Sequence, residues 1–496
     1  MANLDDKGMK TGNKLVFLLI FLILVGTRLY FGLQTPNLHD SAYQDKRYVE
    51  SILEDGKPMV YDSLSYNGKE VIYSPSYYYI LAFFVFVFGS MAFKLIPILF
   101  ISSLVFVIYG ITRKISKDKN LSLFIALMSG FLPIIFVGTL NKISVYTLIL
   151  PIVFYLIYLL INLKKKDIEK YLFFVFILSL LHPIALLFLV VLILYIIITT
   201  TESLRLNKLE KEVILFSVFL ILLVEFFVYK KAFLEHGVNV IWGNVPKQVL
   251  GEYFNLNFLN AIYKVGIPTI LFGVAGLVIG FIKKRKSVFL LGSVALSSLL
   301  LMVLKLAQFK IALMFFGVSL IVLSVIGLKE FLIYLEKTKL SDTLRKYLYV
   351  LVIGFFIVLL LVPSYIDATD SIKNETPSEY EILVLQWIDK NALPDITILT
   401  PLEKGHIVSG IGGKRTVIDE SFLLAPDSSQ RYRDVQTIYS TKSEVEALEL
   451  IYKYNVDYIL IPVETELKYG KVKWLDDKGC FEEIFVGDPK LYKIIC

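Results

Sequence analysis

Long apolar segments recur along the chain and are separated by short polar ones. Most of them approach the ~20 residues that cross the hydrocarbon core of a bilayer. Because lipid cannot hydrogen-bond an exposed backbone, segments of this kind cross as helices. We therefore predict a polytopic α-helical membrane protein with about 11 transmembrane helices, at residues 15–33, 92–112, 120–138, 143–163, 171–182, 184–201, 212–229, 262–282, 287–304, 309–328 and 346–363. The pair 171–182 and 184–201 is short, and His182-Pro183 predicts the break between them because proline lacks a backbone donor.

After residue 363 the pattern becomes that of a soluble domain. Strand patterns at 395–400, 415–419 and 457–462 alternate with helical patterns at 379–390 and 443–454, which predicts a small α/β sheet. The apolar stripe of the first helix is formed by Ile382, Leu385 and Ile388 together with Leu383 and Trp387. We therefore divide the chain into a transmembrane domain, 1–363, with a long polar loop at 34–91, and a soluble α/β domain, 364–496.

The chain ends in a predicted hairpin that pairs 482–486 with 491–495 across the turn 487–490. This hairpin would bring Cys480 and Cys496, the two cysteines of the chain, near each other. They form either a disulfide, which suits an oxidising exterior, or two idle thiols.

The distribution of charge along the chain predicts how the chain is oriented across the membrane. The net charge is +7, and the Lys and Arg residues cluster between the apolar segments, which the positive-inside rule explains without nucleic-acid binding. Lys7, Lys10 and Lys14 predict a cytoplasmic N-terminus in a cell membrane, and the loop 34–91 and the domain 364–496 then lie outside. To keep the basic loops on the cytoplasmic side, residues 77–88 must not cross the membrane. We therefore predict that they form a re-entrant or juxtamembrane helix.

The candidate chemistry begins at Asp40, a carboxylate just after the first apolar segment. Such a group near the outer membrane surface can take a proton from an acceptor hydroxyl as a general base. The structural alternative is that Asp40 caps a helix over 41–54, since Asp is a favoured N-cap residue.

The wider pattern resembles the GT-C superfamily of glycosyltransferases. Five pieces carry the resemblance. Three are Asp40-Ser41-Ala42-Tyr43 through the glycine turn at Gly56, the Pro/Tyr-rich run 73–79, and the turn 88–97 into the next span. The other two are Leu180-Leu181-His182-Pro183 and the basic-aromatic pair in Gln308-Phe309-Lys310. The resemblance is to integral membrane enzymes that use polyprenyl-phosphate sugars, such as prokaryotic protein mannosyltransferases and aminoarabinose transferases. It implies that Asp40 is catalytic, that the donor is a lipid-linked sugar, and that the acceptor is a lipid, a glycan or a protein.

Two further candidates lie in the apolar part of the chain. Lys310, at the start of a late span, can stabilise the departing lipid phosphate as a fixed cation, or it can be a lysine that extends to the interface. His182 can line the same cavity, although a histidine at a helix end is often structural.

Three candidates lie in the outer loop. Arg47 either steers phosphate or pairs with Glu50 or Glu54. Glu70 either supplies a second carboxylate or is a solvated charge. Tyr77 either stacks on the sugar or prenyl chain or belongs to the interfacial aromatic belt.

A divalent metal is compatible with the fold, but the next outer loop, 138–142, lacks the second acid that many GT-C members carry. The tail sequence Lys404-Gly405-His406 lacks the ending of a phosphate loop. Two other functions stay open. A lipid-linked-saccharide transporter or flippase is disfavoured because the span interiors are almost free of charge. A non-catalytic GT-C-like scaffold is kept open by the missing acid.

Overall fold

The computed structural model describes residues 11–204, 206–254 and 257–496. Lys7 and Lys10, on which the cytoplasmic N-terminus was predicted, lie outside the described residues. The chain forms two compact units. The first comprises the residues up to Thr35, Met91–Val228 and Tyr253–Ile372, and the second comprises Pro36–Ser90, Tyr229–Glu252 and Lys373–Cys496. The polar loop that the sequence analysis assigned to 1–363 therefore clusters with the tail.

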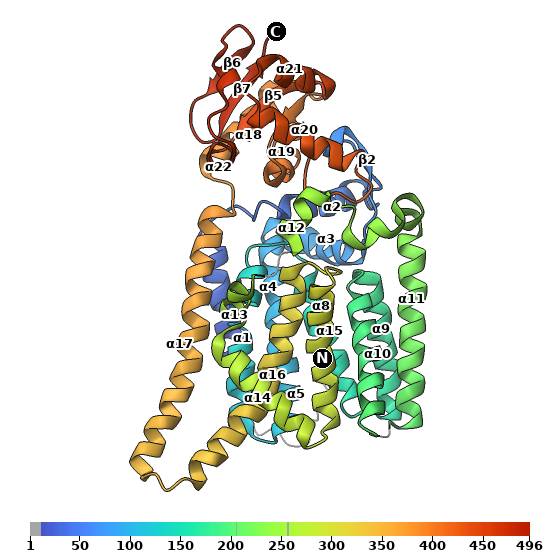
Figure 1. Ribbon diagram of the computed structural model, residues 1–496, viewed down its shortest axis with the longest axis vertical. Helices are drawn as coiled ribbons and strands as arrows, with labels where there is room; N and C mark the ends of the chain where they lie inside the picture. Colours follow the sequence, from blue (N-terminus) through green and yellow to red (C-terminus); the bar gives the residue numbers. More distant parts are fainter. Residues whose placement is uncertain (1–10, 205, 255–256) are drawn as a thin grey trace. The chain divides into compact units, whose positions relative to one another are not determined.

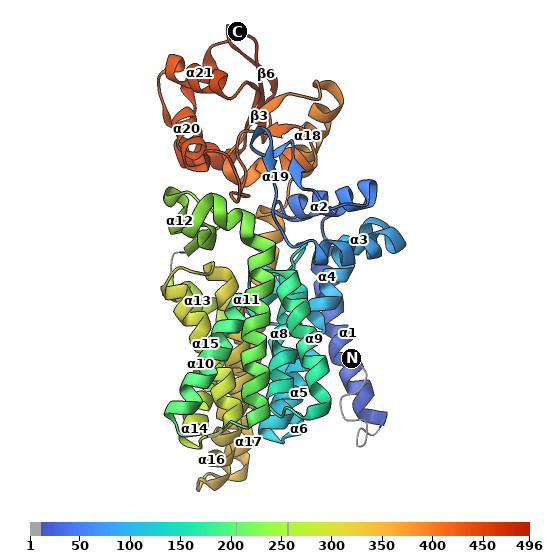
Figure 2. The same ribbon diagram turned by 90° about the vertical axis from the view of Figure 1, so that its right-hand side faces the viewer.

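The first unit is helical (Figures 1 and 2). Its helices are α1 (Thr11–Gly32), α4 (Ala92–Ser102), α5 (Leu104–Ser116), α6 (Lys119–Ser129), α7 (Pro133–Gly138), α8 (Tyr146–Leu160), α9 (Ile168–Leu181), α10 (Ala185–Thr201), α11 (Lys208–His236), α13 (Phe258–Val265), α14 (Ile267–Ile282), α15 (Lys286–Val303), α16 (Phe309–Lys337) and α17 (Asp342–Asn374). The last residues of α11 and α17 belong to the second unit.

Six helical segments among the described residues are long and apolar enough to cross a membrane. The number becomes seven if α13 and α14, bent by 88° at Gly266, are counted as one broken span. The polytopic helical fold is thus confirmed, and the count of about 11 crossings stays a prediction. The predicted break at His182-Pro183 separates α9 from α10.

Helix α16 is the central helix of the first unit and packs closely against α14. Glycines make this approach possible: a Cβ on Gly273 would lie 2.6 Å from the carbonyl oxygen of Leu320, and one on Gly276 would collide with that of Leu323. Small residues at such spacing let two helix backbones meet where the hydrophobic effect does not drive association.

The second unit is built on a five-stranded mixed sheet in the order β4-β3-β5-β7-β6. Its strands are β3 (Thr397–Leu399), β4 (Arg415–Thr416), β5 (Val456–Ile461), β6 (Phe481–Phe485) and β7 (Lys490–Ile494). β3 runs parallel to β4 and β5, whereas β7 is antiparallel to β5 and β6. The surrounding helices are α18 (Glu379–Asn391), α19 (Gly405–Gly410), α20 (Ser428–Ser440), α21 (Glu444–Lys453) and α22 (Val463–Tyr469).

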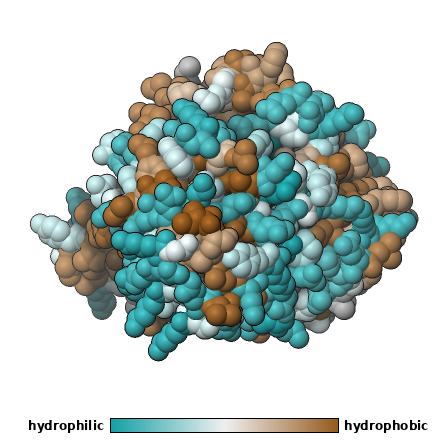
Figure 3. Space-filling view, turned by 90° about the horizontal axis from the view of Figure 1, so that it is seen from above, coloured by the Kyte–Doolittle hydropathy of each residue, from teal (hydrophilic) through white to brown (hydrophobic). Residues whose placement is uncertain are grey.

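The predicted elements of the tail are confirmed, with one correction to a helix face. The buried stripe of α18 consists of Glu381, Val384, Leu385 and Ile388, and Leu383 is 52% exposed. The predicted hairpin is β6–β7, and Cys480 and Cys496 form a disulfide that closes it. In the view of Figure 3, hydrophilic residues cover most of the surface and apolar ones form small groups.

The segment 36–90 contributes α2 (Ala42–Asp55), α3 (Ser76–Phe88) and a two-stranded ribbon of β1 (Tyr61–Asp62) with β2 (Lys69–Glu70) to the second unit. A later segment contributes most of the short α12 (Lys247–Phe254). α2 packs against α3 and against α19 of the tail. The amide of Thr416 also donates to the carbonyl of Leu64 at 2.8 Å. Residues more than 300 positions apart in sequence thus share one core.

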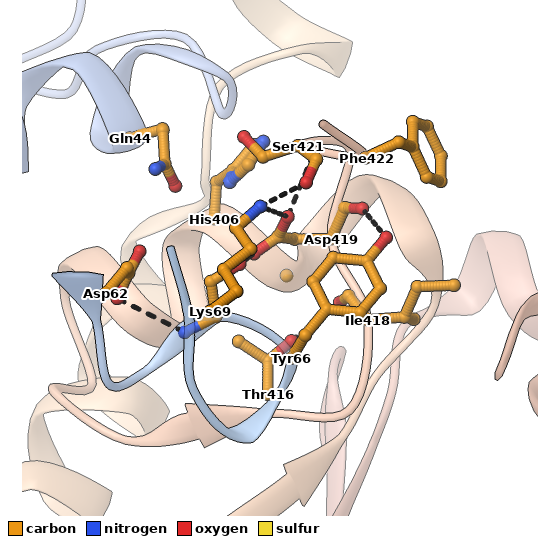
Figure 4. Close-up of polar contacts among 12 residues, drawn as sticks. Gln44, Asp62, Tyr66, Lys69, His406, Thr416, Ile418, Asp419, Ser421 and Phe422 are labelled. Atoms are coloured by element: carbon orange, nitrogen blue, oxygen red, sulfur yellow. Dashed lines mark hydrogen bonds and ion pairs between the residues drawn. The ribbon is translucent and has the colours of Figure 1, made fainter. Parts of the chain in front are cut away.

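A buried polar cluster fixes the ribbon to the sheet (Figure 4). The Lys69 ammonium lies 3.8 Å from the Asp419 carboxylate and donates to the carbonyl of Ser421. Ser65 donates to the same carboxylate at 2.5 Å, and the Tyr66 hydroxyl donates to the Asp419 carbonyl at 2.7 Å. Because the Lys69 and Asp419 side chains are buried, each charge needs the other as an ion-pair partner, and removing either one would leave an uncompensated buried charge.

Candidate active site

Asp40 lies in the segment that leads into α2, and the tail holds it from two sides. Its amide donates to the carbonyl of Glu375 at 3.0 Å. The neighbouring His39 ring lies 3.1 Å from the Glu375 carboxylate, and Asn37 donates to the carbonyl of Pro377 at 3.0 Å. The segment before α2 is therefore fixed to residues 375–377 by backbone and side-chain contacts at and before Asp40.

The alternative in which Asp40 caps α2 is wrong. The N-cap residue is Ser41, in a helical conformation and without a side-chain cap hydrogen bond. The Asp40 carboxylate points elsewhere: its Oδ2 accepts from the Lys404 ammonium at 2.9 Å. A carboxylate that is not consumed by a helix N-terminus is available for chemistry.

Lys404 joins two carboxylates. It ends the 3₁₀ turn Leu402–Lys404 before α19, and its Nζ also donates to Oε2 of Glu381 in α18 at 3.2 Å. The side chains of Asp40, Glu381 and Lys404 are 13%, 6% and 11% exposed. Within the described part of the chain, Asp40 Oδ1 and Glu381 Oε1 are buried without a hydrogen-bond partner. In each carboxylate, one oxygen thus accepts a hydrogen bond from the Lys404 ammonium, and the other has no hydrogen-bond partner among the described residues.

The charges of this cluster do not balance when all three groups are ionised, because two carboxylates face one ammonium. Burial raises the pKa of Asp40, and Lys404 opposes that shift. Burial also raises the pKa of Glu381 to about 7, again against Lys404. Burial lowers the pKa of Lys404, but the two carboxylates outweigh it and raise that pKa above its ordinary value. Retaining one proton on the carboxylates avoids a buried net charge.

Arg47 already has an acidic partner. Its two guanidinium nitrogens bind the Asp62 carboxylate at 2.9 and 2.6 Å, a bidentate pair, and neither expected partner, Glu50 nor Glu54, takes that place. Asp62 is buried, and Arg47 with the amide of Leu64 holds the pKa of Asp62 below its ordinary value despite that burial. Arg47 also lines a hollow of about 830 Å³ between α2, residues 57–61 and the end of α19.

The other two candidates in the segment 36–90 are placed as follows. Glu70 is half-exposed and forms an ion pair with Lys231. Tyr77 is fully buried in α3 with its ring edge-on to Tyr78, at 5.6 Å between centroids. Both belong to the second unit, together with Asp40.

His182 and Lys310 belong to the first unit. His182 Nδ1 accepts from the amide of Ile184 at 3.1 Å, so the proton of a neutral ring lies on Nε2, 3.3 Å from the Tyr146 hydroxyl. This geometry shapes the turn between α9 and α10. Lys310 is the second residue of α16 and is exposed.

Sequence reasoning missed Lys404 and Glu381 as site residues. Lys404 was considered only as part of a glycine-rich segment. Glu381 lies three residues after Ser378 in a capping-box pattern, and the Ser378 hydroxyl does accept from the Glu381 amide at 3.0 Å. That pattern assigns the Glu381 side chain to the helix end, whereas the structure directs it to Lys404. The signal available in the sequence was its spacing, because Glu381 lies four residues before Leu385 and seven before Ile388, on the buried face of α18.

A metal does not fit this cluster as it stands. Calcium takes oxygen ligands at 2.3–2.6 Å and magnesium at shorter distances, whereas the two nearest carboxylate oxygens surround an ammonium. A second acidic group, Glu444 with Asp477, lies beside Cys480, but that sulfur is bound in the disulfide.

The arrangement of helices resembles that of solved membrane glycosyltransferases. The archaeal oligosaccharyltransferase AglB from Archaeoglobus fulgidus, solved with an inhibitory peptide and a dolichol-phosphate, matches with a TM-score of 0.68 and 13% identity over 92% of this chain and 70% of that chain. ArnT from Cupriavidus metallidurans, solved with undecaprenyl phosphate, matches with a TM-score of 0.59 and 11% identity over 98% and 99%. Arabinofuranosyltransferase AftD from Mycobacteria matches with a TM-score of 0.56 and 12% identity over 96% and 41%. The fold is that of the GT-C glycosyltransferases, as the sequence resemblance implied.

A family model described as "Predicted membrane protein (DUF2079)" matches residues 76–462. The match covers well over half of the chain, and the protein belongs to this family. No curated protein matches the sequence.

Proposed function

We propose that this protein transfers a sugar from a polyprenyl-phosphate donor to a hydroxyl- or amide-bearing acceptor at the outer membrane face, with Asp40 as the general base. The acceptor proton passes to the Asp40 carboxylate, the acceptor heteroatom bonds to the anomeric carbon, and the carbon–oxygen bond to the lipid phosphate breaks. The electron pair leaves on that phosphate, and Lys310 is proposed to contact it as a fixed cation.

One observation carries the proposal. The Asp40 carboxylate is fixed through Oδ2 by Lys404, while Oδ1 is buried and unpartnered within the described residues. A base that is already oriented and partly desolvated needs little reorganisation in the transition state. Its raised pKa moves it toward neutral pH, where general bases are most effective.

The test uses purified full-length protein in lipid nanodiscs and a radiolabelled polyprenyl-phosphate sugar. Wild type should release polyprenyl phosphate, and Asp40→Asn should slow that release by about 10²–10⁴-fold, the usual contribution of a general base. Glu379→Gln is the matched control, because it neutralises an exposed carboxylate of the same unit, and it should retain wild-type activity.

Equal rates for wild type and Asp40→Asn, with both proteins monodisperse, would remove Asp40 from the mechanism. Wild-type protein that moves the labelled lipid between leaflets and cleaves none of it would favour a flippase. Protein that does neither would favour a scaffold.

A further inference from the structure

We infer that the ammonium of Lys404 occupies the place of a divalent cation between Asp40 and Glu381, so that the site works with a built-in cation. The role of this cation in catalysis rests on the proposed function. Its position between the two carboxylates rests only on the geometry of the second unit. Lys404 is here a positioning residue, because it acts on the reaction through Asp40.

The convergence of ligands is the first argument. One oxygen of each carboxylate points at a single cationic nitrogen, at 2.9 and 3.2 Å, and the three groups come from three separate segments of the chain. Surface ion pairs rarely order three side chains in this way. Here all three are largely buried, so their geometry is set by the fold.

Charge is the second argument. A buried pair of carboxylates needs a positive partner, and a metal or an ammonium can supply it. The two cannot share the position, because Lys404 fills the space between the oxygens and repels a second cation. The two carboxylates keep Lys404 protonated by raising its pKa. The positive charge is therefore a permanent part of the chain and does not depend on a supply of metal ion.

The free oxygens are the third argument. Asp40 Oδ1 and Glu381 Oε1 remain unpartnered within the described part of the chain. A carboxylate anchored through one oxygen, with the other available, is what a general base requires. Glu381 thus supplies a second carboxylate to the cluster around Asp40, whereas the loop 138–142 contains none.

Binding of Mn²⁺ to full-length protein, followed by electron paramagnetic resonance after chelator treatment, tests the inference. Wild type should show no Mn²⁺ site that depends on Asp40. Lys404→Met keeps the aliphatic stem and removes the charge, so it should create a site that binds Mn²⁺ about tenfold or more tightly than wild type, a difference of about 1.4 kcal/mol or more. Adding Asp40→Asn to this variant should abolish the new site.

Lys390→Met, which removes an exposed lysine of α18, is the control and should leave Mn²⁺ binding unchanged. Mn²⁺ should raise the Tm of Lys404→Met and leave that of wild type unchanged, because only the variant has the vacancy. Transfer activity of wild type should survive a chelator.

An Mn²⁺ site in wild type that Asp40→Asn removes would overturn the inference, as would a folded Lys404→Met without a new site. If Lys404→Met does not fold, Mn²⁺ binding is compared between wild type and Asp40→Asn. Equal binding supports the inference, and weaker binding by Asp40→Asn overturns it. These binding measurements need no turnover. Absent transfer with the expected Mn²⁺ pattern would therefore refute the proposed function and leave the cation replacement standing.

Discussion

Glu381 couples the stability of the second unit to pH. Burial raises its pKa from 4.5 to about 7, and the charges that face it are those of Lys404, Asp40 and Glu464. Between these two pH values the folded chain holds a proton that the unfolded chain has released. The contribution of Glu381 to stability is therefore fully present below about pH 4.5 and is lost as the pH rises through about 7. Asp40, whose pKa is also raised, acts in the same direction.

Glu381→Gln should flatten this decline, because the amide does not titrate. The measurement is the Tm of the full-length protein in detergent across that pH range, for wild type and variant. Glu379→Gln, an exposed position in the first turn of the same helix, should keep the wild-type slope. A variant slope equal to that of wild type would show that Glu381 does not carry this pH dependence.

The sequence singled out Asp40 as a candidate but not Lys404 or Glu381, the other two members of its cluster, and the reason is distance along the chain. Lys404 is 364 residues from Asp40, and Glu381 is 23 residues from Lys404. A pattern of residue types around Asp40 contains no information on which distant cation approaches it. In the same way, Arg47 has an acid on its own helix at the spacing that predicts a pair, yet the fold brings Asp62 into the bidentate position.

Helices α14 and α16 depend on glycine for their contact. A methyl group at Gly276 would meet the carbonyl oxygen of Leu323, a backbone atom that cannot rotate away. Gly276→Ala should therefore push the helices apart and cost about 1–3 kcal/mol, the usual range for overpacking. A clear fall in Tm in detergent is expected.

Gly354→Ala in α17 is the matched control, since nothing lies within 4 Å of its new Cβ. It should be neutral or stabilising, because alanine is favoured over glycine in a helix interior by roughly 0.5–1 kcal/mol. Similar Tm values for the two variants would mean that α14 and α16 tolerate a wider separation.

Elements were predicted best where one local signal was sufficient. The hairpin β6–β7 follows from alternation and turn residues, and the break between α9 and α10 follows from one proline. The face of α18 was not determined locally, because Leu383 and Val384 are adjacent and both apolar, and only tertiary packing selects Val384 for burial.

The charge pattern predicts the orientation of the whole chain in the membrane. Reporter fusions after Lys117 and after Asp370 should report opposite sides, with Lys117 in the cytoplasm and Asp370 outside, because the basic loops face inward. A protease-protection assay on a tag at the C-terminus gives an independent reading, with cleavage expected from outside. Both fusions on one side would contradict the predicted crossings.

The sequence by itself determined that this chain is a helical membrane protein with an α/β tail, because hydrophobic length and periodicity are local properties of successive residues. It also indicated Asp40, through a short polar pattern after the first apolar segment. Only the tertiary structure decided that residues 36–90 share a core with the tail, and that Lys404 stands between two carboxylates. Those contacts join positions hundreds of residues apart, and they form because buried charges must find partners once the apolar elements have packed.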